Sequence, residues 1–297
     1  MARYVAPILL CDADPRNWSA DLCLHALLAF GSDVSGDIVI GNAALEAAQH
    51  LLRLPQTVEA FPELAERALS GEIMGSSAAG EQPKFSWSLR GPQGELVANL
   101  VKFSPPMHSA SGQRWADLLA AEAIADRLLG GASATVDVAN RRFLMSPRFD
   151  RVGASGRRGL ISLGAVDSAY FGGLDNWALC ASRLERLGWL SQDDANTLRL
   201  RYFFGRAIGN TDMHFGNASL VFNPALPMAL APSYDMLPMI FAPLANGEVL
   251  ARSFTPPTSS NDPIQAKAHA LAKQFWRHVE QDSRISAEFA KLAKSLA

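Results

Sequence analysis

The 297-residue sequence lacks a cysteine framework. It has three cysteines, Cys11, Cys23 and Cys180, with neither a CxxC spacing nor an even number. This pattern excludes a disulfide scaffold and argues against a structural zinc site. We therefore expect three buried free thiols and a protein that works in a reducing compartment.

Long apolar runs and an excess of charge of one sign are also missing. No window of the sequence reaches the length of a membrane span. The formal net charge of −2 gives no basic field that would drive nonspecific binding to nucleic acid. We expect a cytoplasmic protein that neither enters a membrane nor binds DNA directly.

The segment GNTDMHFGNAS, residues 209–219, carries the most specific pattern in the chain. Asp212 is followed five positions later by Asn217, a spacing that phosphotransferases use to orient a hydroxyl and hold a metal ion from one loop. Lys102 lies upstream in ELVANLVKF, and Asp235 lies downstream in PSYDMLP. This is the order in which kinases place their catalytic parts along the chain.

The residue types suit transfer of a phosphoryl group, which depends on positioning and on neutralising charge. Lys102 would offset the charge of the ATP phosphates. Asn217 and Asp235 would hold Mg²⁺, which prefers oxygen ligands. Asp212 would accept or orient the proton of the attacking hydroxyl. By itself Asp212 is more typical of a turn or helix cap, but its spacing to Asn217 and Asp235 favours the catalytic interpretation.

Lys102 is predicted to need a buried partner. Alternation along its strand places it on the same face as apolar side chains, where a cation must be paired. Glu122 lies in the apolar stripe of a helix predicted over residues 111–130. We expect a Lys102–Glu122 ion pair as in kinases, and Asp117 is the alternative partner.

The order of the predicted elements indicates a β-rich half followed by a helical half. A turn, a strand and a turn are expected at residues 31–42, and a hairpin at about residues 71–110. Helices dominate beyond about residue 170. We predict an α+β, bilobal, protein-kinase-like fold with a small β-rich N-terminal lobe, a large all-helical C-terminal lobe and a cleft where they meet.

Four segments resemble HipA-like serine/threonine kinases, the toxins of bacterial type II toxin–antitoxin modules. They are GSSAAGEQPKF, SPRFDRV, GNTDMHFGNASL and PSYDMLP, in family order, and GEQPKF resembles the YjjJ branch. The resemblance covers about residues 17–290. It implies an N-terminal subdomain at residues 1–70, an N-lobe portion at 71–150 and a helical C-lobe at 151–297. The chain begins partway into the family's N-terminal portion, so we expect a truncated start or a second polypeptide that supplies the rest.

The resemblance also implies a loop over the ATP phosphates, with Ala79, Gly80 and Lys84 near the nucleotide. Ser77, or its neighbour Ser76, would be the autophosphorylation site whose modification ejects the loop and silences the kinase. The loop is not a Walker A motif, because Glu-Gln follows its second glycine where Lys and Ser or Thr are required. A mobile turn without function is the alternative.

Three further nucleotide contacts are implied by the resemblance alone. RFDR would form the hinge between lobes, with the Phe149 backbone at the adenine and Asp150 near the ribose. His214 would lie beside the phosphates or the metal. The alternatives are a salt-bridged strand end for RFDR and a structural role for His214.

We therefore expect an ATP- and Mg²⁺-dependent serine/threonine protein kinase. The resemblance implies a toxin that acts on a translation-related protein, such as an aminoacyl-tRNA synthetase. It also implies an antitoxin with a helix-turn-helix domain, through which alone the chain would reach DNA. An antibiotic-type small-molecule phosphotransferase shares the spacing but lacks GEQPKF and RFDR. A catalytically silent partner of a repressor is disfavoured because the kinase residues are intact.

Overall fold

The chain divides into two compact units. The computed structural model describes residues 11, 17–51, 57–70, 82–91, 94–153, 155–258 and 260–297. Unit 1 comprises Met1–Phe103 and Met145–Gly159, and unit 2 comprises Ser104–Leu144 and Leu160–Ala297. The chain thus crosses between units three times, and the domain boundaries near residues 70 and 150 stay a prediction.

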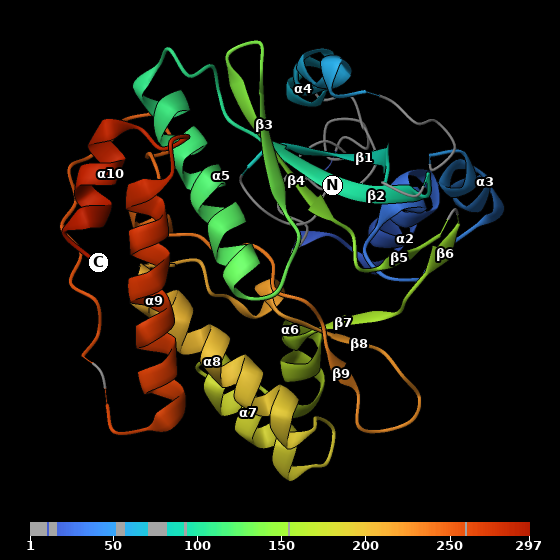
Figure 1. The fold of residues 1–297 in the computed structure, drawn as a ribbon. Helices are drawn as coiled ribbons and strands as arrows, with labels where there is room; N and C mark the ends of the chain where they lie inside the picture. Colours follow the sequence, from blue (N-terminus) through green and yellow to red (C-terminus); the bar gives the residue numbers. More distant parts are fainter. Residues whose placement is uncertain are drawn as a thin grey trace. The chain divides into compact units, whose positions relative to one another are not determined.

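Unit 1 contains short helices and a hairpin (Figure 1). Its elements are α2 (Ala20–Phe30), η2 (Gly31–Asp33), α3 (Asn42–Leu51), η3 (Val58–Ala60), α4 (Phe61–Leu69), β1 (Lys84–Arg90), β2 (Leu96–Phe103), β5 (Arg151–Val152) and β6 (Gly156–Arg157). The strand expected within residues 31–42 is wrong, because this segment is irregular after η2. Gly36 and Gly41 have φ of 88° and 90°, which interrupts an extended strand.

The predicted hairpin is confirmed. Strands β1 and β2 pair antiparallel, with Lys84 opposite Lys102. One face of the hairpin carries Phe85 and Trp87, whose rings lie 5.5 and 5.3 Å from that of Phe61 on α4, edge to face. This aromatic cluster forms a core for unit 1, and the opposite face of the hairpin carries the two lysines.

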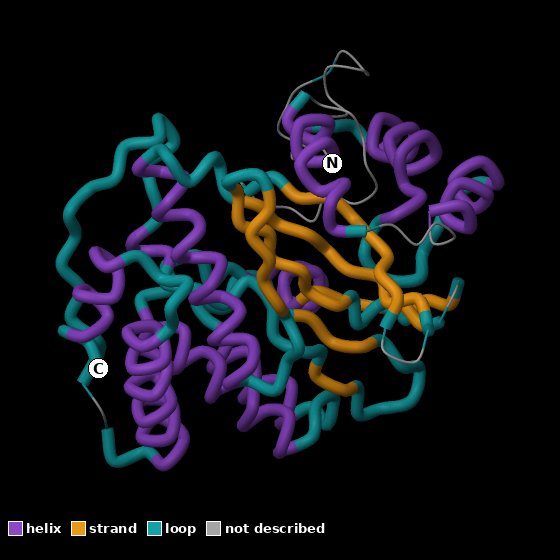
Figure 2. Tube along the Cα trace, turned by 45° about the horizontal axis from the view of Figure 1, so that its top comes forward, coloured by secondary structure: helices purple, strands orange, loops and turns teal. Residues whose placement is uncertain are grey.

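The strand pairing gives a four-stranded order β1-β2-β4-β3; within unit 1, β1 and β2 lie side by side, and Figure 2 draws the strands as orange tubes. The other two strands are β3 (Ala134–Val138) and β4 (Arg141–Pro147). The remaining elements, all in unit 2, are α5 (Ala110–Leu128), β7 (Leu160–Ser162), α6 (Leu163–Val166), the π-helix η4 (Asp167–Phe171), α7 (Trp177–Arg186), α8 (Gln192–Ile208), η5 (Phe215–Asn217), β8 (Ser219–Val221), β9 (Ala229–Leu230), η6 (Met239–Phe241), α9 (Pro263–Gln281) and α10 (Ala287–Lys294).

Helices α8 and α9 form the centre of unit 2 (Figure 1). Helix α8 packs against α7 and α9, and α9 also contacts α5 and α10. Phe204 on α8 meets Phe275 on α9 edge to face at 5.9 Å, and both are fully buried. Trp177 and Trp276 are buried in the same core. These contacts hold the C-terminal end of α8 in a fixed place.

The expectation of an all-helical large lobe is wrong. Unit 2 contains a three-stranded sheet of order β7-β8-β9. These strands have only two or three residues each, too few for a period-two pattern to be recognised in the sequence. Strand β8 begins two residues after η5, which contains Asn217. The sheet therefore directly follows the loop that the sequence predicted to be catalytic.

The cysteines are free, but only Cys180 is buried. Burial raises the pKa of the Cys180 thiol to about 12. Cys11 and Cys23 are half-buried, so the expectation of three buried thiols is wrong for these two. Cys23 belongs to helix α2, which buries only Ala26. Over the part of the chain that the structure describes, no helix is both long enough and apolar enough to cross a membrane.

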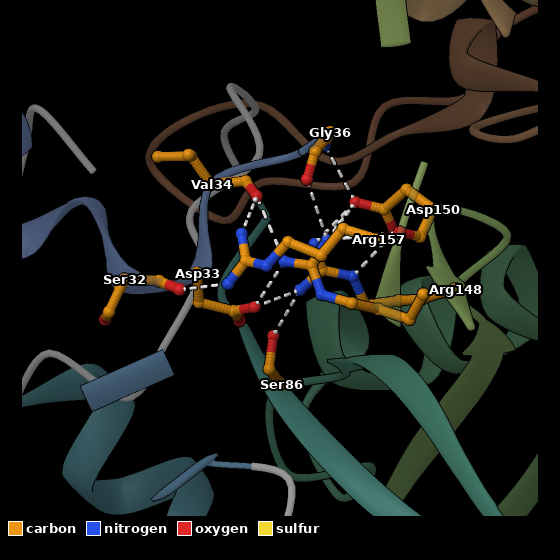
Figure 3. Close-up of polar contacts among 9 residues, drawn as sticks. Ser32, Asp33, Val34, Gly36, Ser86, Arg148, Asp150 and Arg157 are labelled. Carbon is orange, nitrogen blue, oxygen red and sulfur yellow. Dashed lines mark hydrogen bonds and ion pairs between the residues drawn. The ribbon is translucent and has the colours of Figure 1, made fainter. Parts of the chain in front are cut away.

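A buried cluster of charges links η2 to the start of β5 within unit 1 (Figure 3). Asp33 accepts from Arg148 and Arg151 at 2.6 and 2.7 Å, and Asp150 accepts from the same arginines at 2.8 and 2.6 Å. The Gly36 N–H donates to Asp150 at 2.9 Å. Each of the four charged side chains is less than a tenth exposed. Such a network stays favourable only while every charge keeps its partners.

The cluster predicts a loss of stability in acid. Burial acts to raise the pKa of Asp150, but the hydrogen bond from Arg148 and the charges of Arg148 and Arg151 outweigh it and hold the pKa below its ordinary 3.8. A depressed folded-state pKa contributes stability above the unfolded-state pKa, and this stability is lost as the pH falls through the folded-state value. We expect Asp150→Asn to lower the free energy of unfolding at neutral pH by about 3–5 kcal/mol and to flatten its decline in acid.

Urea unfolding over a series from about pH 6 to about pH 2 measures this effect. Asp37→Asn removes an exposed acid from the same segment and is the matched control, with an expected change within about 0.5 kcal/mol. Parallel acid profiles for Asp150→Asn and the wild type would contradict the assignment of acid sensitivity to this cluster.

Candidate functional site

The candidate site begins where helix α8 ends. Gly209 caps the helix with φ of 79°, a left-handed conformation that favours glycine. Its carbonyl accepts from the Ile240 N–H at 3.0 Å, and a Cβ on Gly209 would come within 2.8 Å of Ile240 Cγ2. Glycine is therefore required both by the turn and by the close approach of a second segment.

Asn210 connects the two segments that the sequence singled out. Its side-chain Oδ1 accepts from the Asp212 N–H at 3.0 Å, and its Nδ2 donates to the Asp235 carbonyl at 3.2 Å. Its own N–H donates to the Gly205 carbonyl at 2.8 Å. Sequence reasoning missed Asn210, although an Asn two positions before an Asp, directly after a helix-ending glycine, is a signal for a side-chain-closed turn.

Asp212 and Asn217 are brought together by a hydrogen bond across the loop. Asn217 Nδ2 donates to the Asp212 carbonyl at 2.8 Å. Asn217 is buried, whereas the Asp212 side chain is 52% exposed. The spacing of five residues thus becomes a closed loop in which the amide is fixed and the carboxylate faces solvent.

His214 lies beside Asp212 and supports the same loop. Its Nδ1 accepts from the Gly216 N–H at 3.0 Å, which leaves the proton of the neutral ring on Nε2. Nε2 lies 3.8 Å from Asp212 Oδ1. The His214 carbonyl accepts from the Trp177 indole N–H at 3.2 Å. These contacts fit the structural role left open for His214, and its role at phosphate or metal stays a prediction.

Asp235 adopts a left-handed backbone conformation with φ of 53°. Asp tolerates this conformation better than most residues, but it still costs about 1–3 kcal/mol. The preceding Tyr234 anchors the segment: its hydroxyl lies 2.7 Å from that of Ser219 and donates to the Gly216 carbonyl at 3.0 Å. Burial raises the pKa of Tyr234 to about 12, so the phenol stays neutral and able to donate.

The donor set at Asn217 and Asp235 suits Mg²⁺. Because Asn217 Nδ2 donates to Asp212, its oxygen points elsewhere, and none of the described residues donates a hydrogen bond to it. Within the described ranges, no group of three or more His, Cys, Asp or Glu could hold a metal ion. Mg²⁺ is commonly held by one or two protein oxygens together with phosphates and water, so an amide and a carboxylate fit this ion.

Unit 1 carries two lysines on one face of its hairpin. Lys84 lies directly opposite Lys102 in the antiparallel register, and Lys102 is 5% exposed. Side chains at opposite positions share a face with Cβ atoms about 4.5–5.5 Å apart, where like charges are unfavourable. The hairpin therefore carries two lysines on one face, and their contacts with a nucleotide stay a prediction.

The alternative partner proposed for Lys102 is engaged elsewhere. Asp117 accepts from the N–H and the hydroxyl of Ser286 at 2.8 and 2.6 Å, and from Gln113 at 3.2 Å. These contacts link α5 to the beginning of α10. Glu122 on α5 is 4% exposed, and its pairing with Lys102 stays a prediction.

The remaining predicted nucleotide contacts are Phe149, Asp150 and three residues of the loop proposed to cover the ATP phosphates. The carboxylate of Asp150 is occupied by the charged cluster of unit 1, which matches the salt-bridged alternative for RFDR. Its role near the ribose, like that of Phe149 at the adenine, stays a prediction. Ser77, with its neighbours Ala79 and Gly80, lies outside the described residues.

Comparisons with known proteins give one consistent family. Residues 76–296 match the HipA-like C-terminal domain, and residues 1–49 match the middle domain of YjjJ-like toxins. Toxin YjjJ of Escherichia coli K12 is 37% identical over 308 aligned positions, which cover 99% of this chain and 69% of that protein.

Solved structures that are similar to this chain include the following two. HipA of Shewanella oneidensis MR-1, solved with HipB and operator DNA, is 18% identical with a TM-score of 0.58, covering 94% of this chain and 78% of that one. The Helicobacter pylori proinflammatory kinase CtkA is 13% identical with a TM-score of 0.46, covering 74% and 88%. The first likeness shows that this chain shares the HipA fold.

The close approach at Gly209 predicts a destabilising substitution. Gly209→Ala should lose about 1–3 kcal/mol from the left-handed backbone and more from the clash with Ile240. Gly188→Ala is the matched control, since Gly188 also has positive φ, 69°, but a Cβ there meets nothing within 4 Å. Urea unfolding compares the two variants. Equal losses would show that the approach of Ile240 adds no constraint.

Proposed function

Because the chain belongs to the HipA-like family, and within it to the YjjJ-like branch, we propose that it is an ATP- and Mg²⁺-dependent protein kinase that phosphorylates serine or threonine. One observation carries the proposal: a solvent-facing carboxylate, Asp212, lies in a loop closed by the buried amide of Asn217 and linked through Asn210 to Asp235. Kinase chemistry needs such an acid beside metal ligands.

Each residue has a distinct role in the proposed reaction. Asp212 orients the substrate hydroxyl and accepts its proton. Because its carboxylate is exposed, a serine or threonine on the surface of a protein substrate can reach it. Asn217 and Asp235 hold the metal ion, which would neutralise charge on the phosphate oxygens. Lys102, with Lys84 opposite it, binds the phosphates, and Glu122 orients Lys102.

The biological role is proposed from the relatives. YjjJ is a toxin, and the Shewanella HipA was solved with HipB and operator DNA. We infer that this chain is a toxin in the cytoplasm, that a helix-turn-helix antitoxin binds it, and that its target is a translation-related protein such as an aminoacyl-tRNA synthetase. The net charge of −2 supports contact with DNA through the partner only.

Substitution of the proposed base tests the activity. Asp212→Asn should reduce phosphate transfer from Mg-ATP by about 10²–10⁴-fold while nucleotide affinity stays close to wild type, because Asp212 faces the hydroxyl and not the nucleotide. Radiolabel incorporation into the protein itself and into casein measures transfer, and calorimetry measures affinity. Asp175→Asn, which removes another exposed acid of unit 2, should change neither. Undiminished transfer by Asp212→Asn would exclude Asp212 as the base.

Transfer to a small-molecule antibiotic but to no protein would indicate the other class of phosphotransferase.

Ser77 provides a test of regulation. A phosphate there would add about −1.5 to −2 charges to the loop proposed to cover the ATP phosphates, so modification should lower ATP affinity. Mass spectrometry after incubation with Mg-ATP should find phosphate on Ser77 or Ser76 in the wild type and none in Asp212→Asn. Phosphorylated protein that binds ATP as tightly as unmodified protein would contradict this autoinhibition.

A further inference from the structure

The geometry points to Asn210 as a positioning residue that holds the proposed base loop and the proposed metal-binding segment in one fixed arrangement. Asn210 is 4% exposed. One side of its amide accepts from the Asp212 N–H, and the other side donates to the Asp235 carbonyl. One short side chain therefore contacts the backbone of both residues, although Asp235 lies 25 positions after Asn210 in the chain.

The two segments also share a surface on helix α8. A Cβ on Gly205 would lie 2.6 Å from the sulfur of Met213 and 3.0 Å from that of Met236. Met213 follows Asp212 and Met236 follows Asp235, so each segment places a methionine against the same glycine. The Gly205 carbonyl accepts from the Asn210 N–H at 2.8 Å, which fixes Asn210 to that turn of the helix.

The residue type follows from these contacts. The position requires an acceptor and a donor on one short, rigid side chain, and asparagine supplies both. Aspartate keeps the acceptor but loses the donor while it is ionised, and alanine loses both. Loss of the donor also leaves the carbonyl of Asp235 without this partner, at a residue whose backbone has φ of 53°. Asn210 thereby opposes a relaxation of Asp235 away from the site.

The role of this arrangement rests on the proposed function. A base and a metal ligand act together only when their separation is held closely, and a displacement of about 1 Å can reduce the rate by about 10²-fold. Residues that orient metal ligands typically change metal affinity by about 10–100-fold when they are substituted. We expect Asn210 to act on Asp235 through such an effect, without touching substrate.

Two variants separate the two contacts. Asn210→Asp keeps the acceptor for the Asp212 N–H but replaces the donor to the Asp235 carbonyl with a carboxylate oxygen. Asn210→Ala removes both groups. Asn223→Asp is the matched control, since Asn223 Oδ1 accepts from the N–H two residues on, as Asn210 does, but on an exposed turn. Amide hydrogen exchange at Asp212 in nucleotide-free protein reads the first contact. The Mg²⁺ concentration needed to bind a non-hydrolysable ATP analogue, measured by calorimetry, reads the second.

For Asn210→Asp we expect wild-type protection of the Asp212 amide and a rise of about tenfold or more in the Mg²⁺ requirement. Asn210→Ala should lose protection at Asp212 and show the same rise in the Mg²⁺ requirement. A purely structural defect would not raise the Mg²⁺ requirement while leaving the Asp212 amide protected, as we expect for Asn210→Asp.

Each other outcome overturns part of the inference. A wild-type Mg²⁺ requirement in Asn210→Asp overturns the action on Asp235, and unchanged exchange at Asp212 in Asn210→Ala overturns the action on the loop. If Asn210→Ala does not fold, the combination of a protected Asp212 amide and a raised Mg²⁺ requirement in Asn210→Asp decides alone. If the wild type binds the analogue with Mg²⁺ but transfers no phosphate, the proposed function fails while the exchange and binding results still decide on Asn210.

Discussion

The candidate site depends on how helix α8 ends. Gly209 turns the chain out of the helix with a left-handed backbone, and this turn places Asn210 where its amide contacts both Asp212 and Asp235. The helix is fixed in turn by its packing against α7 and α9, with Phe204 fully buried. The position of the loop is therefore set by the hydrophobic core of unit 2, because a close-packed interior allows little displacement of the elements that it holds.

Within the loop, buried groups hold the backbone and an exposed group is available for chemistry. Asn210 and Asn217 are 4% and 5% exposed, and both donate to main-chain carbonyls. The neutral Tyr234 phenol holds Gly216. The Asp212 carboxylate is half exposed. Buried polar groups that keep their hydrogen bonds make a segment rigid, so a loop with little regular structure can present one carboxylate in a constant orientation.

Unit 1 joins two stretches of sequence that match different family domains. Asp33 lies in the part that matches the YjjJ-like middle domain, and Arg148, Asp150 and Arg151 lie in the part that matches the HipA-like C-terminal domain. The ion pairs between them are buried, which makes each charge costly to leave unpaired. The N-terminal stretch is thereby linked to the hairpin sheet through Arg148, which also donates to Ser86 on β1.

The sequence by itself determined the features that depend on neighbours along the chain. Period-two and period-3.6 patterns located the β1–β2 hairpin and α5 and indicated a helical region beyond about residue 170, and the spacing of Asp212 and Asn217 placed both residues on one loop. Only the tertiary structure decided the contacts between distant residues. Asn210 and Asp235 are separated by 25 positions and Asp33 and Arg148 by 115, and the strands β7 to β9 are too short to leave a pattern. Local periodicity carries no information about such pairs, because they form only after the core has placed their elements side by side.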